Sequence, residues 1–214
     1  MDTEIKESIR KILNNFAGMD YIRPQDVPDI ALYMDQVTTF MEERLKSCRR
    51  HDDDKIMTKT MINNYAKNGL IPPPDRKKYS KEHLLIFIFI YYFKSFLSIS
   101  DIETLITPLT ETYFNSGEDF NVEKVYRLIY DMIHGQLGYM AKDLIRRYEL
   151  SNLDFEGCDE EDKAYLHDFA FICLLSFDVY VKKQMIEKLI DDMPDPKTVR
   201  HKAGSRRKDP ETSR

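Results

Sequence analysis

MINNYAKNGLIPPP, residues 61–74, is the stretch that decides the fold of this chain. It ends an amphipathic segment at a glycine, continues through two aliphatic residues and then places three prolines in a row. Gly69 can adopt the left-handed backbone conformation that ends a helix, and proline cannot continue one. At the other end, the hydroxyl of Thr58 can accept a hydrogen bond from a free backbone amide of the first turn. The stretch therefore predicts a short helix over 58–67 and a stiff connection after it.

The predicted helix has an apolar face and a polar face. Helical spacing turns Met61, Ile62 and Tyr65 toward a core and leaves the polar residues outside. The connection that follows, PPPDRKKY over 72–79, carries three consecutive cations. A helix that enters the major groove of DNA needs short polar side chains near its N-terminus, and a neighbouring basic segment can hold phosphates. The pattern indicates a DNA-reading helix (58–67) followed by a short basic wing (72–79).

Side-chain chemistry assigns the expected contacts to DNA. Asparagine pairs bidentately with adenine, threonine and lysine reach bases or phosphates, and a helix N-terminus such as that at Thr58 attracts phosphate. The expected base or groove contacts are Lys59, Thr60, Asn63 and Asn64. The expected contacts to the sugar-phosphate backbone are Tyr65, Lys67, Arg76, Lys77, Lys78 and Tyr79.

Residues 62–106 resemble the winged helix-turn-helix of the MerR family of transcription regulators. In that family a reading helix with an Ile and a Tyr runs into G-L-[LI]-x-P, a wing, Y-S-x-x-[DH]-L, an apolar helix and S-[LI]-x-[ED]-I-x-x-L. The matching residues, in the same order, are Ile62, Tyr65, Gly69-Leu70-Ile71, Pro73, Tyr79-Ser80, His83-Leu84, Ser98-Ile99, Asp101-Ile102 and Leu105. This resemblance implies a DNA-binding regulator of transcription.

The chain departs from the MerR pattern in three respects. The turn before the reading helix is longer, Asn63 stands where arginine is usual, and the wing is shorter. The whole chain also resembles an uncharacterised bacterial domain-of-unknown-function family with a MerR-like N-terminal half. The expected fold class is mainly α, with a winged helix-turn-helix domain over 1–116, a helical region for dimerisation or effector response over 117–196, and a disordered basic tail over 197–214.

Hydrophobic spacing and capping residues predict the other helices. Two precede the reading helix, over 3–16 and 28–47. Ser80 is suited to cap an apolar helix that runs to about Leu97. A capping box formed by Ser100 and Glu103 predicts a short helix that stops before Pro108. Two longer helices are predicted over about 122–148 and 160–192.

The distribution of charge favours a localised anionic partner. The formal net charge is -5, yet residues 55–81 hold seven basic residues and one acidic residue, and residues 197–214 hold seven and two. An acidic body with two basic patches is consistent with double-stranded DNA as the partner. One short helix reads few base pairs, so we expect a homodimer that reads two half-sites.

Several other classes of function lack support. Cys48, Cys158 and Cys173 show no CxxC spacing, which favours a reducing cytoplasm over disulfides or a zinc ribbon. The most apolar run, 84–93, is half the ~20 residues that cross a bilayer, so we expect a buried helix and no membrane role. No catalytic, nucleotide-binding or metal motif occurs, and the acidic loop 51–54 is expected to be solvated. We therefore expect no enzyme activity, cofactor or metal.

Two alternatives remain open at the level of sequence. The same fold could serve as a protein-interaction module that uses its basic face on an acidic protein. The aromatic-rich C-terminal helices could instead hold a pocket for an unidentified small-molecule effector, with His134 and His167 either lining it or satisfying core hydrogen bonds.

Overall fold

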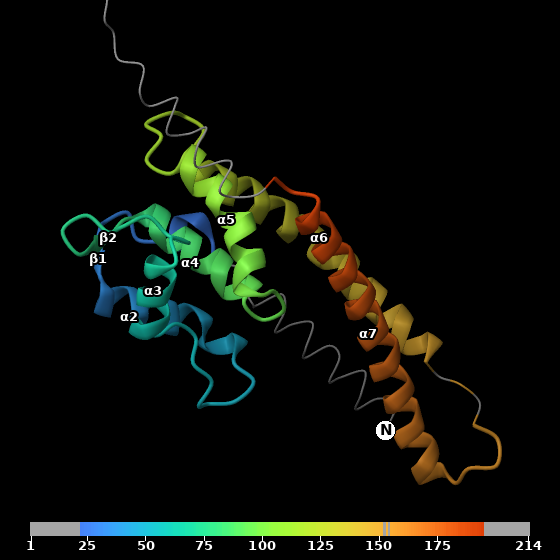
Figure 1. Cartoon of the computed structure of the whole chain (residues 1–214). Coiled ribbons are helices and arrows are strands. Elements are labelled where there is room, and N and C mark those ends of the chain that lie inside the picture. The colour runs from blue at the N-terminus through green and yellow to red at the C-terminus, as the bar shows by residue number, and fades with distance from the viewer. Residues whose placement is uncertain (1–21, 152, 154, 195–214) are drawn as a thin grey trace, which may run out of the picture. The chain divides into compact units, whose positions relative to one another are not determined.

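Helices dominate the computed structural model, which describes residues 22–151, 153 and 155–194 (Figure 1). The α-helices are α2 (Met34–Leu45), α3 (Lys59–Lys67), α4 (Lys81–Phe93), α5 (Ile99–Tyr113), α6 (Val122–Leu150) and α7 (Glu160–Asp191). Short 3-10 turns occur at Pro24–Asp26 and Lys46–Cys48. This content confirms the expected mainly α class. The helix expected over 3–16 and the basic tail over 197–214 lie outside the described residues.

The described residues fall into two compact units, 22–130 with 187–194 and 131–186. The first contains a small antiparallel sheet, in which β1 (Leu32–Tyr33) pairs with β2 (Lys78–Tyr79) in the register Leu32 to Tyr79 and Tyr33 to Lys78. This sheet joins the segment before α2 to the segment before α4. It therefore ties the two ends of the α2–α3 segment together.

Helix α4 forms the centre of the first unit. Every residue from His83 to Ile90 is buried, and α4 packs against both β2 and α5. A helix that is apolar on all sides is stable in water only when neighbours surround it. The expectation of a buried helix is confirmed for the run up to Ile90.

The expected helix over 28–47 begins later than its spacing suggests. Helix α2 starts at Met34, because residues 32–33 pair as a strand and the amide of Tyr33 donates to Oε1 of Gln36 at 2.9 Å. Ile30 and Tyr33 fall at helical spacing, yet both are exposed and lie outside the helix. Periodicity failed here because two-residue strand pairing depends on a partner almost fifty residues away.

Helix α5 corrects two further expectations. Its capping box is formed by Ser98 and Asp101, with both hydrogen bonds at 3.1 Å, and not by Ser100 and Glu103. The helix also continues through Pro108 to Tyr113. Proline removes one backbone hydrogen bond and usually bends or ends a helix. Here burial of Ile106, Thr107 and Thr110 holds the second half of the helix against the core.

The second unit contains two long helical segments, and the expected helices over 122–148 and 160–192 are confirmed as α6 and α7. Within this unit the Tyr148 ring meets His167 and Phe171 edge-on, with centroids 4.7 and 5.3 Å apart. The Ser151 hydroxyl lies 3.2 Å from Nε2 of His167, so this histidine has a hydrogen-bonding partner between the helices. By length and composition alone, Asp162–Asp191 of α7 could also cross a membrane, and its apolar window is not buried.

Candidate nucleic-acid interface

Both ends of α3 are set by local hydrogen bonds. The Thr58 hydroxyl accepts from the amide of Met61 at 3.2 Å, which confirms the expected N-cap. At the other end Gly69 has φ +71°, and the amide of Leu70 donates to the carbonyl of Tyr65 at 3.0 Å. A bond between these positions after a left-handed residue is the Schellman arrangement, which satisfies carbonyls that the helix leaves free. The segment 58–69 therefore folds as its own residues dictate.

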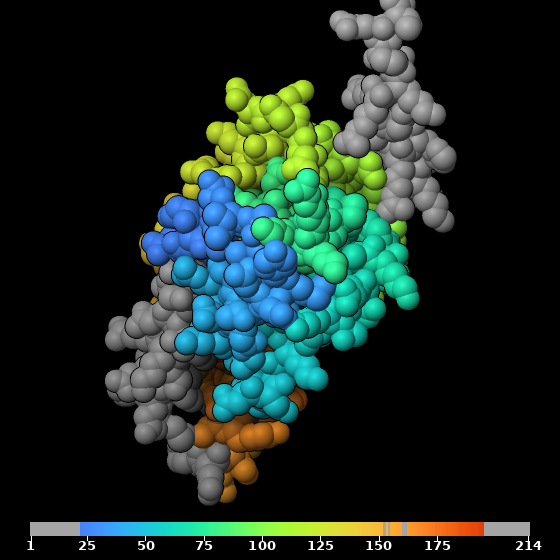
Figure 2. Space-filling model, turned by 90° about the vertical axis from the view of Figure 1, so that its left-hand side faces the viewer, coloured from blue at the N-terminus to red at the C-terminus, as the bar shows by residue number. Residues whose placement is uncertain are grey.

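The outer face of α3 carries the polar residues that the sequence assigns to DNA. Ile62 and Tyr65 are buried and hold the helix on the first unit. Five residues lie at helical spacing on the other side, and all are exposed: Lys59, Thr60, Asn63, Asn64 and Lys67. Figure 2 shows the first unit from one side, with its residues coloured from blue to green.

The tip of the wing is a tight turn with two cations in an unusual backbone conformation. The amide of Lys78 donates to the carbonyl of Asp75 at 2.8 Å, and the residues between them, Arg76 and Lys77, have φ of +47° and +66°. Two left-handed central residues define a type I′ turn, which normally carries Asn-Gly. A side chain in this region costs about 1–2 kcal/mol per residue. Such strain is often found at functional sites.

The cations of this surface differ in their ionic partners. Within the described part of the chain, the side chains of Lys67, Arg76 and Lys77 form no ion pair. Lys59 pairs with Asp35 of α2, and both side chains are largely exposed. An exposed pair is worth at most about 1 kcal/mol and can be replaced by a phosphate. Three of the surface cations are thus available to an anion, and a fourth is weakly held.

Two residues assigned to the DNA backbone are corrected by their burial. Tyr65 and Tyr79 lie in the core, and desolvation raises the pKa of both phenols. The ring of Tyr79 packs against His83 and Phe87, with centroids 5.4 and 5.7 Å away. Little of either side chain remains for a phosphate. Their role is to position α3 and the wing, and the hydroxyl of Thr58 is likewise used within the helix cap.

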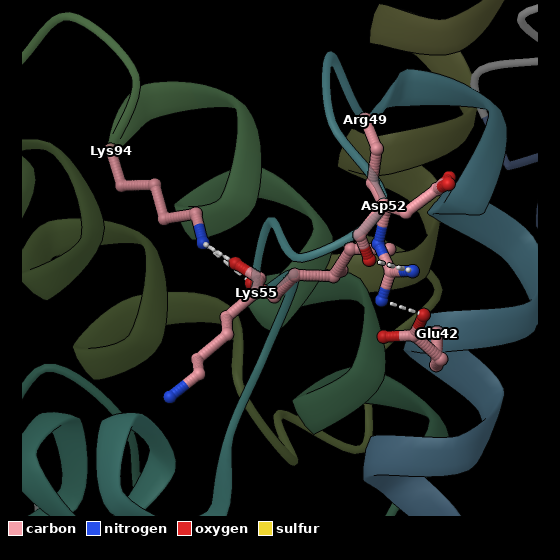
Figure 3. Close-up of polar contacts among 6 residues, drawn as sticks. Glu42, Arg49, Asp52, Lys55 and Lys94 are labelled. Atoms are coloured by element: carbon pink, nitrogen blue, oxygen red, sulfur yellow. Dashed lines mark hydrogen bonds and ion pairs between the residues drawn. The ribbon is translucent and has the colours of Figure 1, made fainter.

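The long turn between α2 and α3 is held from two sides (Figure 3). From the end of α4, the Lys94 ammonium donates to the carbonyl of Ile56 at 2.5 Å and to that of Lys55 at 3.4 Å. Partial burial lowers the pKa of this ammonium group. Because Ile56 lies three residues before the start of α3, the contact holds the segment that leads into the helix against the end of α4.

A second set of contacts closes the same turn on itself. Arg49 pairs with Glu42 of α2 and donates to the carbonyl of Asp52 at 3.2 Å (Figure 3). The carboxylate of Asp54 accepts from the amides of His51 and Arg50, and the first of these bonds is the main reason that its pKa is lowered. In the part of the chain that the structure describes, no three His, Cys, Asp or Glu side chains form a group able to hold a metal ion.

His83 connects the wing to α4, a role that the sequence did not reveal. Its Nδ1 accepts from the amide of Ser80 at 3.0 Å, so Nε2 carries the proton and donates to the carbonyl of Pro72 at 3.2 Å. Burial lowers the pKa of this imidazole, although the bond to Pro72 acts in the opposite direction. The neutral ring thus joins the first residue of the wing to the first turn of α4. The sequence marks His83 in two ways: it matches the motif Y-S-x-x-[DH]-L, and it lies three residues after Ser80, where a capping box has Glu or Gln.

The pH dependence of stability should report this contact. Because the folded pKa of His83 lies below its unfolded value of about 6.5, the unfolded state takes up a proton first as pH falls. Stability is then complete above about pH 7.5 and falls below pH 6.5 until the folded pKa is passed, by at most about 1.4 kcal/mol per pH unit. We expect His83→Gln to keep the capping bond and to flatten this slope in urea titrations between pH 5 and 8. An unchanged slope in this variant would assign the pH dependence to another group.

Tyr33 is a second residue whose place the sequence missed. It is exposed beside the wing, and the ammonium of Lys78 lies 5.1 Å from the centre of its ring. The contact is a cation-π interaction, which orients the cation without neutralising it. Strand pairing between β1 and β2 brings the two residues opposite each other. The sequence offers no signal for this pair because its members lie far apart in the chain.

Comparison with known families gives one match. A family model with the description "Domain of unknown function (DUF1836)" matches residues 22–129. The matched segment runs from the start of the first unit into α6, and it includes α3, the wing and His83. No curated protein and no solved structure matches the chain.

Proposed function

Since the chain belongs to the DUF1836 family, whose match contains the whole polar surface of α3 and the wing, we propose that it is a cytoplasmic DNA-binding regulator of transcription. In this proposal the first unit acts as a MerR-like winged helix-turn-helix: α2 supports, α3 reads bases and residues 72–79 form the wing. The family description states no mechanism. The proposal therefore rests on the residues themselves.

One observation carries the proposal: an exposed polar helix face shares the first unit with a turn whose tip presents two cations that have no ionic partner among the described residues. Asn63 and Asn64 supply the amide groups that pair with adenine, and Lys59 and Thr60 lie one turn nearer the helix N-terminus. Arg76 and Lys77 supply charge without sequence preference, which suits contacts to phosphate. Asp35 opposes DNA binding, because its ion pair with Lys59 must break before Lys59 can contact DNA.

Asn63→Ala tests the reading helix. Because Asn63 is exposed, we expect stability to change by less than about 0.5 kcal/mol. Loss of its amide should reduce discrimination at one base pair by about 1–3 kcal/mol, and so relax the preferred sequence. Selection of bound fragments from genomic DNA, followed by gel-shift titration, measures both quantities. Thr112→Ala, on the exposed surface of α5, is the matched control.

The same selection distinguishes DNA binding from the alternative function, in which the basic face binds an acidic protein. A protein-interaction module would enrich no DNA sequence in either the natural chain or the Asn63 variant. That result would remove the DNA-binding proposal while leaving the fold intact.

The wing is tested by replacing Arg76 with Asn and Lys77 with Gly. These residues favour a type I′ turn, so we expect the free energy of unfolding to rise by about 1–2 kcal/mol. DNA affinity should fall about tenfold for all sequences, and the slope of log K against log salt should decrease by about 2. Chemical denaturation and gel shifts at two salt concentrations provide these values.

A control for the wing removes two charges elsewhere. Lys46→Gln with Lys124→Gln changes the net charge equally at exposed positions outside the proposed surface. If this control weakens binding as much as the wing variant does, the effect is one of overall charge and the wing has no specific role.

We further propose that two copies pair through the second unit. Large apolar residues are exposed on both of its helices, including Met132, Tyr139, Phe169, Ile172, Phe177 and Tyr180. Each of these six side chains is between 51% and 70% exposed. Monomers rarely expose contiguous apolar patches above a few hundred Å², and larger ones commonly mark interfaces. A second copy that packs on these helices would remove these side chains from water.

The spacing of the exposed residues fits helix pairing. On α7, Tyr165, Phe169, Ile172 and Val179 follow the alternation of four and three residues that marks a coiled-coil seam, with Ser176 completing the series. On α6, a Cβ added at Gly135 or Gly138 would meet nothing within 4 Å. Glycine inside a helix is about 1 kcal/mol less favourable than alanine, and it allows another backbone to come close.

Charge on these helices favours a second copy over a membrane. Asp178 lies within the apolar part of α7, where it pairs with Arg147 of α6 at 3.3 Å and with Lys182 at 2.6 Å. Arg147 in turn pairs with Asp143 at 2.6 Å. Moving this network into hydrocarbon would bring several charges out of water. An interface between proteins can instead leave them at its solvated edge.

A further inference from the structure

A cavity of about 410 Å³ lies against the wing in the first unit. Its lining comes from four segments: Ala31 before β1, the wing, the start of α4, and Asn115 after α5. The volume falls within the range of sites that hold small molecules. It exceeds that of an inorganic anion several-fold, so it suits a small organic ligand.

The groups around the cavity differ in charge. Arg76 and Lys78 bring two cations, and Asp75 brings one carboxylate. Three uncharged polar residues complete the lining: Ser80, His83 and Asn115. Of these, Ser80 and His83 already hydrogen-bond to each other at 2.9 Å. The wing therefore supplies all the charge of the lining, and it supplies both signs.

We propose that this cavity binds a phosphorylated small molecule that also carries a hydroxyl group. Arg76 and Lys78 take the phosphate oxygens, because paired cations match the charge of a phosphate. A hydroxyl of the ligand donates to Asp75, and the side-chain amide of Asn115 offers further hydrogen bonds. A carboxylate in the lining disfavours an anion that cannot donate a hydrogen bond.

The consequence for DNA rests on the proposed function, because Arg76 and Lys78 are also proposed contacts to the DNA backbone. A ligand that occupies both cations removes them from the duplex. The bound molecule then acts as an antagonist of DNA binding, and the wing serves both as the effector site and as a contact to DNA.

Occupancy is tested on the full chain with ribose 5-phosphate and inorganic phosphate as probes and sulfate at equal ionic strength as the control. We expect ribose 5-phosphate at 10 mM to raise the melting temperature by about 2–4 °C and sulfate to raise it by less than about 1 °C. A comparable rise with inorganic phosphate would identify free phosphate as a sufficient ligand, and a smaller one would show that the sugar hydroxyls contribute. Equal shifts with all three anions would overturn the inference.

Two variants locate the binding. Asn115 has φ +49°, so Asn115→Gly removes the amide without straining the backbone. We expect it to weaken ribose 5-phosphate about threefold to tenfold by calorimetry, and Lys78→Gln to weaken it at least tenfold. Thr112→Ala should leave binding unchanged. If neither cavity variant changes the affinity, the ligand binds elsewhere and the inference fails.

Fluorescence anisotropy with a selected DNA fragment separates this inference from the proposed function. We expect ribose 5-phosphate, but not sulfate at the same ionic strength, to raise the apparent Kd for DNA at least fivefold. Ligand binding in a chain that binds no DNA would reject the regulator and keep the site. DNA binding in a chain that no phosphate stabilises would reject the site and keep the regulator. An unchanged Kd for DNA at saturating ligand would overturn the antagonism.

Discussion

Ile172→Glu is expected to convert a dimer into a monomer and to weaken binding to a two-half-site DNA fragment by at least about 100-fold. Ile172 lies near the middle of the exposed stripe on α7, and 58% of its surface is accessible. In a single copy the new carboxylate would remain in water, so the fold should persist. In the paired state it would be buried in an apolar seam without a partner, which is strongly unfavourable.

Sedimentation equilibrium over a range of concentrations measures the oligomeric state of the variant. Circular dichroism shows whether its fold persists. Thr112→Glu adds the same charge at an exposed position of α5 and should leave the dimer unchanged. A natural chain that is monomeric at all concentrations would refute the pairing, even if the variant failed to fold. Flotation of the natural chain with lipid vesicles would instead assign the apolar surface of α7 to a membrane.

Ile62→Ala is expected to lower the free energy of unfolding by about 2–5 kcal/mol. Ile62 has no accessible surface, and it is one of two buried residues by which α3 packs on the first unit. Truncation removes apolar contacts and leaves a cavity between α3 and its neighbours. The adjacent Asn63 is exposed. A change at Ile62 should therefore lower stability, whereas a change at Asn63 should alter the DNA sequence that is preferred.

Urea denaturation provides the measurement, and Ile62→Val is the graded control, with an expected loss of about 0.5–1.5 kcal/mol. DNA affinity should fall with the folded fraction in Ile62→Ala and recover where the protein is refolded by lower temperature or a stabilising osmolyte. A loss below about 1 kcal/mol would show that α3 is held by something other than this side chain. It would also weaken the argument that burial orients the polar face outward.

The amino-acid sequence by itself determined the elements whose signals are local. Thr58 caps α3 and Gly69 ends it through hydrogen bonds to residues within one or two turns, so the helix could be predicted from that stretch alone. Continuous apolar residues required α4 to be buried, because no side of it can face water. Helical spacing likewise predicted α6, α7 and the outward positions of Asn63 and Asn64.

Only the tertiary structure decided how distant segments meet. It buried Tyr79, paired β1 with β2, carried α5 through Pro108 and placed His83 between the wing and α4. It also assembled the cavity from four separate segments. Periodicity and capping rules describe interactions between residues a few positions apart in the chain. The features above depend instead on contacts between residues that are tens of positions apart. Burial by a distant neighbour can reverse a local preference because it changes which groups are in water.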